Sequence, residues 1–87
     1  MSEREVDHES ETPVYVQIAA YVITDIEKGE IPVGRRIPSE SALVQRYGVA
    51  RETARAAVRH LRERGYVRTV PQRGSFVIDR TAAGAED

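Results

Sequence analysis

The first third of the chain carries apolar side chains at intervals of four residues. They are Val14, Ile18, Val22 and Ile26, with Ala19 and Ile23 beside them. This spacing puts the apolar side chains on one face and predicts an amphipathic helix over residues 13–28. We expect Thr12 to cap the start of this helix with Pro13 as its first residue, and Gly29 to end it in the left-handed conformation.

Two shorter helical patterns follow. The first is predicted over residues 40–47, where Ser39 is a good N-cap and the carboxylate of Glu40 suits the positive end of the helix dipole. The second is predicted over residues 51–64. The short connection between them, residues 48–50, is typical of a helix-turn-helix.

The last part of the chain has a β-rich pattern. Residues 66–70 and 75–78 are rich in Val, Tyr, Phe and Ile and flank a turn that contains Pro71 and Gly74, so they predict a hairpin. A brief strand is also expected beside residues 36–37. The sequence therefore predicts a mainly α fold with a small β-hairpin (α+β), in which a helix-turn-helix is followed by a wing.

Charge is distributed unevenly, although the formal net charge is only −1. Residues 1–12 carry five acids against one base and few apolar side chains, so we expect this segment to be disordered. Residues 35–80 instead carry eleven arginines against four acids, a charge of +7. We expect residues 13–80 to form the one folded domain and residues 81–87 to be a flexible tail.

Arginines line one side of the predicted helix 51–64. They are Arg51, Arg55, Arg59 and Arg62, opposite the apolar residues Ala54, Ala57, Val58 and Leu61. Arginine presents a planar fork of donors that can chelate a phosphate or the O6 and N7 edge of guanine. An ordinary solvated helix face is the alternative interpretation, but the helix-turn-helix context favours binding to DNA.

The rest of the chain offers little other chemistry. It has no cysteine, which excludes disulfides, thiol nucleophiles and Cys-ligated zinc. Its two histidines, His8 and His60, have no companions at metal-ligand spacing, and no Ser/His/Asp set can be identified. We therefore predict no enzyme activity, no cofactor and no metal site. Because neither a signal peptide nor a run of about 18 apolar residues is present, we expect a cytoplasmic, nucleoid-associated protein.

Several separated motifs resemble those of the GntR-type bacterial transcription regulators. They are Pro13-Val14-Tyr15-Val16-Gln17-Ile18, Pro38-Ser39-Glu40, Tyr47-Gly48-Val49-Ala50-Arg51-Glu52-Thr53-Ala54-Arg55 and Arg73-Gly74-Ser75-Phe76-Val77. The resemblance covers about residues 13–78 and implies a winged helix-turn-helix that binds a roughly palindromic operator as a homodimer, usually as a repressor.

The same resemblance implies roles for individual residues. Arg51 and Arg55 would reach base edges in the major groove, Thr53 would contact a phosphate, and the wing, residues 71–75, would enter the minor groove. The predicted DNA-binding residues are Ser39, Glu40, Arg51, Glu52, Thr53, Arg55, Arg59, Gln72, Arg73 and Gly74.

Three positions depart from the family pattern. Ser41 stands where many relatives carry an arginine, so we expect one contact from the helix 40–47 to be absent. Ala50 cannot cap the helix 51–64 as a Ser or Thr would, at a typical cost of about 1 kcal/mol. Gln72 replaces a common wing-tip glycine, so we expect a different turn in which the side chains of Gln72 and Arg73 make the contacts.

Chain length is the largest departure, because most relatives continue into a larger effector-binding domain. The chain is either a stand-alone DNA reader, which Met1 and the acidic tail favour, or a shortened piece of a longer regulator. In both cases we expect no small-molecule effector site in these residues. A different hypothesis is a winged-helix module that binds other proteins without reading a base sequence. Steep salt dependence of DNA binding would distinguish the two.

Overall fold

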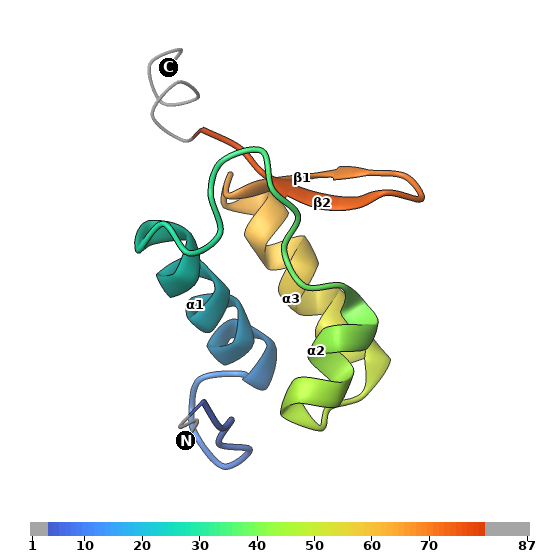
Figure 1. The fold of residues 1–87 in the computed structure, drawn as a ribbon. Coiled ribbons are helices and arrows are strands. Elements are labelled where there is room, and N and C mark those ends of the chain that lie inside the picture. Colours follow the sequence, from blue (N-terminus) through green and yellow to red (C-terminus); the bar gives the residue numbers. More distant parts are fainter. Residues whose placement is uncertain (1–3, 80–87) are drawn as a thin grey trace.

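Three helices and one hairpin form in the predicted order (Figure 1). They are α1 (Val14–Glu27), α2 (Glu40–Tyr47), α3 (Arg51–Glu63), β1 (Val67–Val70) and β2 (Gly74–Val77). The computed structural model describes residues 4–79, so the predicted tail 81–87 lies outside the described residues. Within the described part, no helix combines the length and the apolar character needed to cross a membrane.

The start of α2 agrees with the prediction and the start of α1 does not. Ser39 caps α2, because its Oγ accepts a hydrogen bond of 3.0 Å from the backbone N–H of Ala42. Pro13, not Thr12, occupies the N-cap position of α1, and no side chain caps that helix. The helix begins one residue later than predicted, which leaves Thr12 outside it, where its carbonyl accepts a hydrogen bond of 2.8 Å from Gln17.

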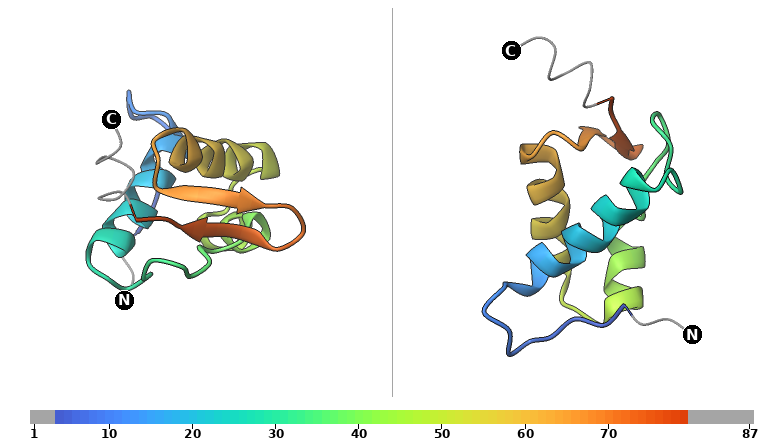
Figure 2. Two further views of the ribbon diagram at one scale, coloured as in Figure 1. Left: turned by 90° about the horizontal axis from the view of Figure 1, so that it is seen from above. Right: turned by 90° about the vertical axis from the view of Figure 1, so that its left-hand side faces the viewer.

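One hydrophobic core joins the three helices to the hairpin. Its largest fully buried side chains come from all of these parts: Ile18 of α1, Leu43 of α2, Leu61 of α3 and Val67 of β1. Helices α1 and α2 both pack against α3 (Figures 1 and 2). Because the apolar face of α3 is covered from both sides, its polar face is the one that points away from the core.

The hairpin is antiparallel and lies at one end of the helices (Figure 2). Its register pairs Val67 with Val77 and Val70 with Gly74. The strand predicted beside residues 36–37 is reduced to a single bridge between Arg36 and Phe76. Backbone hydrogen bonds on either side extend this contact. Gly34 N–H donates to Val77 O at 2.8 Å, Ile37 N–H donates to Ser75 O at 2.9 Å, and Val77 N–H donates to Arg35 O at 2.9 Å. The connector between α1 and α2 therefore pairs with the free edge of β2.

The N-terminal arm, residues 4–12, makes polar contacts with α1, although its composition predicts disorder. The arm has no helix or strand, but Arg4 forms a two-pronged ion pair with Asp25 of α1, at 2.6 and 2.8 Å. The Gln17 amide exchanges hydrogen bonds of 2.8 and 2.9 Å with the backbone of Asp7. Low apolar content predicted disorder, whereas polar contacts to α1 hold these residues. Residues 1–3 lie outside the described part.

Candidate nucleic-acid interface

Helix α3 has a buried apolar face and an exposed face that carries arginines. Ala54, Ala57, Val58 and Leu61 are buried, whereas Arg51, Arg55, Arg59 and Arg62 are exposed. The side chains of Arg51 and Arg55 keep 55% and 53% of their surface open to solvent. The predicted outward projection of the arginine row is therefore present in the structure.

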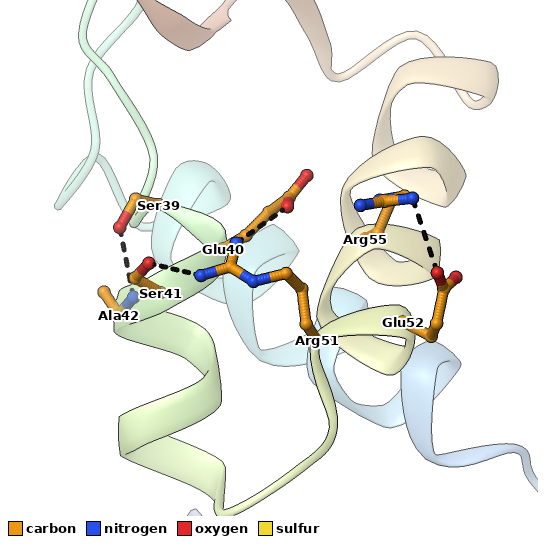
Figure 3. Close-up of polar contacts among 7 residues, drawn as sticks. All are labelled: Ser39, Glu40, Ser41, Ala42, Arg51, Glu52 and Arg55. Atoms are coloured by element: carbon orange, nitrogen blue, oxygen red, sulfur yellow. Dashed lines mark hydrogen bonds and ion pairs between the residues drawn. The ribbon is translucent and has the colours of Figure 1, made fainter.

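Arg51 is held across the turn between α2 and α3. Its Nη2 donates a hydrogen bond of 2.8 Å to Ser41 Oγ, and its Nη1 lies 3.3 Å from Glu40 Oε1 (Figure 3). Ser41 was absent from the predicted site because only its difference from the relatives was apparent in the sequence. In the structure Ser41 helps to orient the first arginine of α3.

The next arginines of α3 are held less firmly. Arg55 lies 3.4 Å from Glu52, one turn earlier on the same helix, and the Glu52 side chain is 82% exposed (Figure 3). Exposed ion pairs of this kind contribute only about 0–1 kcal/mol, so a DNA phosphate or base can replace the carboxylate. Among residues 4–79, the Arg59 guanidinium has no hydrogen-bond or ion-pair partner.

A groove separates α3 from the hairpin. It is lined by Glu40, Arg55, Val58, Arg59, Arg62, Thr69, Val70, Gln72, Gly74 and Ser75. Arg62 Nη1 donates a hydrogen bond of 3.1 Å to Thr69 Oγ1, which lies 2.9 Å from Ser75 Oγ. Sequence reasoning placed Arg62 in the arginine row but missed these hydroxyl groups, because their contact with α3 depends on how the hairpin packs.

The wing keeps a conformation that normally favours glycine. Gln72 has a φ of 67° and is the only non-glycine residue of the described chain with positive φ. The expectation was a turn without the positive φ that glycine adopts readily, but Gln72 itself adopts the left-handed conformation. The side chains of Gln72 and Arg73 are both exposed at the wing tip, as predicted.

Two other predicted residues, Ser39 and Thr53, already make hydrogen bonds within the protein. Ser39 is exposed, but its hydroxyl already accepts the capping hydrogen bond from Ala42. Thr53 is half-buried in the first turn of α3, where its N–H donates to the carbonyl of Ala50 at 3.0 Å. As predicted, no side chain of Ala50 caps α3.

Arg36 is a residue of this surface that sequence reasoning missed. Its Nη1 donates a hydrogen bond of 3.0 Å to the carbonyl of Arg73 at the wing tip. The adjacent prolines and glycine predicted only a short extended segment, and no local pattern indicates a partner so far along the chain. Arg36 adds a further cation beside the wing.

Comparisons with known proteins agree with this arrangement. The family described as bacterial regulatory proteins, gntR family, matches residues 14–77. The mannosyl-D-glycerate transport/metabolism system repressor MngR of Escherichia coli (strain K12) is 38% identical over 65 residues, which are 75% of this chain and 27% of that protein. The uncharacterized HTH-type transcriptional regulator YurK of Bacillus subtilis (strain 168) is 37% identical over 68 residues, 78% of this chain and 28% of that protein. The chain thus spans little more than a quarter of the length of these relatives.

This chain spans most of the length of two solved structures with the same fold. YtrA from Sulfolobus acidocaldarius, a GntR-family transcription factor, superposes with a TM-score of 0.77 and 33% identity, covering 98% of this chain and 93% of YtrA. AraR(DBD) in complex with operator ORR3 superposes with a TM-score of 0.74 and 33% identity, covering 83% of this chain and 87% of that one. The three helices and hairpin are therefore a winged helix-turn-helix, as predicted.

Proposed function

Because this chain belongs to the gntR family of bacterial regulatory proteins, we propose that it binds double-stranded DNA in a sequence-specific manner and regulates transcription. Helix α3 reads the major groove and the wing, residues 71–75, enters the adjacent minor groove. The observation that carries this proposal is the exposed arginine face of α3, which continues through the groove beside α3 to the cationic wing tip. A polyanionic duplex supplies the negative charge that this surface lacks.

The contacts divide according to how the side chains are held. Arg51, oriented by Ser41, and Arg55 are the base-reading residues, because a guanidinium fork gives two parallel hydrogen bonds to guanine. Arg59 and Thr53 contact phosphates and set the register of α3 on the duplex. Gln72 and Arg73 contact the minor groove. The remaining predicted residues of the interface are Ser39, Glu40, Glu52 and Gly74.

We further propose that the chain acts as a repressor and occupies a palindromic operator as a homodimer. MngR is described as a repressor, and AraR(DBD) was solved with an operator. Two-fold symmetry in such an operator matches two copies of one winged helix, each on its half-site. The proposal includes no enzymatic reaction and no cofactor, and DNA binding would place the protein at the nucleoid.

Arg55→Ala tests the proposal against a control with the same loss of charge. We expect Arg55→Ala to weaken binding to the preferred duplex by about 1–3 kcal/mol and to relax discrimination at one base pair. Arg46→Ala is the control, because Arg46 of α2 lines a pocket with Asp25 to which no residue of α3 contributes. Affinities would be measured by fluorescence anisotropy on a duplex selected from a random library and on single-base variants of it.

Two results would contradict the proposal. If the wild-type chain bound no duplex, DNA recognition would be rejected and a protein-binding module favoured. If Arg55→Ala weakened every duplex equally, Arg55 would be a phosphate contact and not a base-reading residue. Sedimentation with and without DNA tests the dimer, and full protection of a single unpaired half-site by a monomer would rule it out.

A further inference from the structure

Arg36 contacts the wing although it belongs to neither α3 nor the hairpin. It lies in the connector between α1 and α2, where its backbone bridges to Phe76 of β2. From that position its guanidinium reaches along the hairpin, and Nη1 donates a hydrogen bond of 3.0 Å to the carbonyl oxygen of Arg73. The backbone of Arg36 is therefore paired with the sheet, and its guanidinium is bound to the wing tip.

The stem of Arg36 passes directly over Gly74. A Cβ atom added at Gly74 would lie 2.6 Å from Arg36 Cδ, closer than real Cβ atoms approach other heavy atoms, and 3.0 Å from Cγ, a very tight contact. Gly74 also has a φ of 119°, a conformation that other residues rarely adopt. The missing side chain of Gly74 thus makes the space through which Arg36 reaches Arg73.

The same contact lies beside the strained residue of the turn. Gln72, with its φ of 67°, immediately precedes Arg73, whose carbonyl is the one that Arg36 binds. The strands pair Val70 with Gly74 across this turn, and within it Arg73 N–H donates to Val70 O at 3.0 Å. The bond from Arg36 adds a further restraint, from outside the hairpin, on the residue that carries the cation of the wing tip.

We propose that Arg36 is a positioning residue for the wing. Its hydrogen bond to the Arg73 carbonyl holds the backbone of Arg73 so that the Arg73 side chain can enter the minor groove. This inference rests on the proposed function, because it concerns how that DNA contact is made. Arg36 acts through Arg73, and Gly74 is required for its passage. A side chain outside the recognition helix and the wing thereby controls the minor-groove contact.

Paired variants at adjacent arginines separate this role from the loss of one charge. Arg35 and Arg36 are both exposed, and of these two side chains only that of Arg36 donates a hydrogen bond to the wing. Arg36→Met and Arg35→Met each remove one charge and keep an unbranched stem. Each would be combined with Arg73→Ala in a double-mutant cycle, with affinities measured on the library-selected duplex and folding checked by circular dichroism.

We expect Arg73→Ala to weaken binding roughly tenfold in the wild-type and Arg35→Met chains, the size of one lost contact. In the Arg36→Met chain the same change should cost less than about threefold, because the Arg73 side chain is no longer held in place. Hydroxyl-radical protection of the minor groove at the wing should weaken in Arg36→Met and persist in Arg35→Met. Equal loss in all three backgrounds, or unchanged protection in Arg36→Met, would overturn the proposal.

Gly74→Ala provides a second, independent test. The new methyl group should displace Arg36 and weaken binding at least as much as Arg36→Met does. It should cost less in the Arg36→Ala background, where the clash is gone and only the backbone strain at a φ of 119° remains. Gly29→Ala is the matched control, since Gly29 has a φ of 83° and nothing within 4 Å of the added atom. If Gly74→Ala bound DNA like the wild-type chain, the proposal would fail while wild-type DNA binding, and so the proposed function, would stand.

Discussion

At the scale of single residues, the contacts that the sequence hides are polar and reach across the chain. Arg4 lies 5.3 Å from the centre of the Tyr21 ring while it pairs with Asp25. Tyr21 in turn stacks on Tyr47 of α2, with ring centres 5.7 Å apart. Composition alone predicts a disordered arm, because no periodic pattern indicates that one arginine will find a carboxylate and an aromatic face together.

The Arg4–Asp25 pair predicts a pH-dependent part of the stability. The hydrogen bond from Arg4 holds the pKa of Asp25 below its usual value. A carboxyl whose pKa is lowered in the folded state stabilises the protein at any pH above the pKa of the same carboxyl in the unfolded chain, about 3.9. This contribution is lost as the pH falls through the pKa of the folded state. We expect Asp25→Asn to lower the free energy of unfolding by about 1 kcal/mol at pH 7.

Thermal unfolding followed by circular dichroism between pH 7 and pH 2 would check this. The difference between Asp25→Asn and the wild-type chain should begin to shrink below about pH 4 and disappear below the lowered pKa of Asp25, where its carboxyl is protonated and uncharged like the asparagine amide. Glu27→Gln on the exposed side of α1 is the control for removing one acidic charge. A difference that stayed constant over the whole pH range would show that the ion pair is not its source.

At the scale of elements, α2 and α3 both begin at the predicted residue, but only α2 has a side-chain cap. Ser39 and Ala50 precede α2 and α3 with nearly the same extended backbone, at φ −69° for both and ψ 166° and 156°. Only Ser39 has a side-chain oxygen to accept a hydrogen bond from the first turn. The spacing of apolar residues predicted all three helices, but the weak strand beside Arg36 depended on the hairpin to which it pairs, which local patterns do not show.

This comparison predicts that Ala50→Ser stabilises the protein. The serine hydroxyl can accept from a backbone N–H of the first turn of α3, as Ser39 Oγ does in α2. We expect a gain of about 1 kcal/mol, which raises the melting temperature by roughly 4–8 °C in a domain of this size. Ser39→Ala should lose a similar amount. An unchanged melting temperature in Ala50→Ser would mean that the first turn of α3 cannot use the added cap.

At the scale of the whole molecule, the charge pattern predicted where the interface lies better than it predicted how the interface is held. The arginine face of α3 could be located from spacing alone, because helical periodicity determines which residues share a side. The contacts of Ser41 with Arg51, and of Arg36 with Arg73, join segments that only tertiary packing brings together. The candidate site could therefore be predicted by its cations but not by the groups that orient them.

The same charge pattern predicts steep salt dependence of DNA binding. Each phosphate that an arginine neutralises makes the slope of log affinity against log salt more negative by about 0.9, so Arg59 alone contributes about −0.9 and every further arginine that meets a phosphate steepens the slope by the same amount. Anisotropy titrations between about 50 and 300 mM salt would measure it. Arg59→Ala should make the slope shallower by about 0.9, whereas Arg46→Ala should leave it unchanged. A flat response in the wild-type chain would indicate that the arginine face does not meet phosphates.

The pairing of β2 on both edges has a consequence for the entropy of binding. With β1 on one side and the connector on the other, the base of the hairpin is already fixed before any duplex arrives. Only the few residues of the turn retain conformational freedom that association must remove. Most of the wing is thus preorganised, and little of the energy gained in the minor groove is spent on immobilising its backbone.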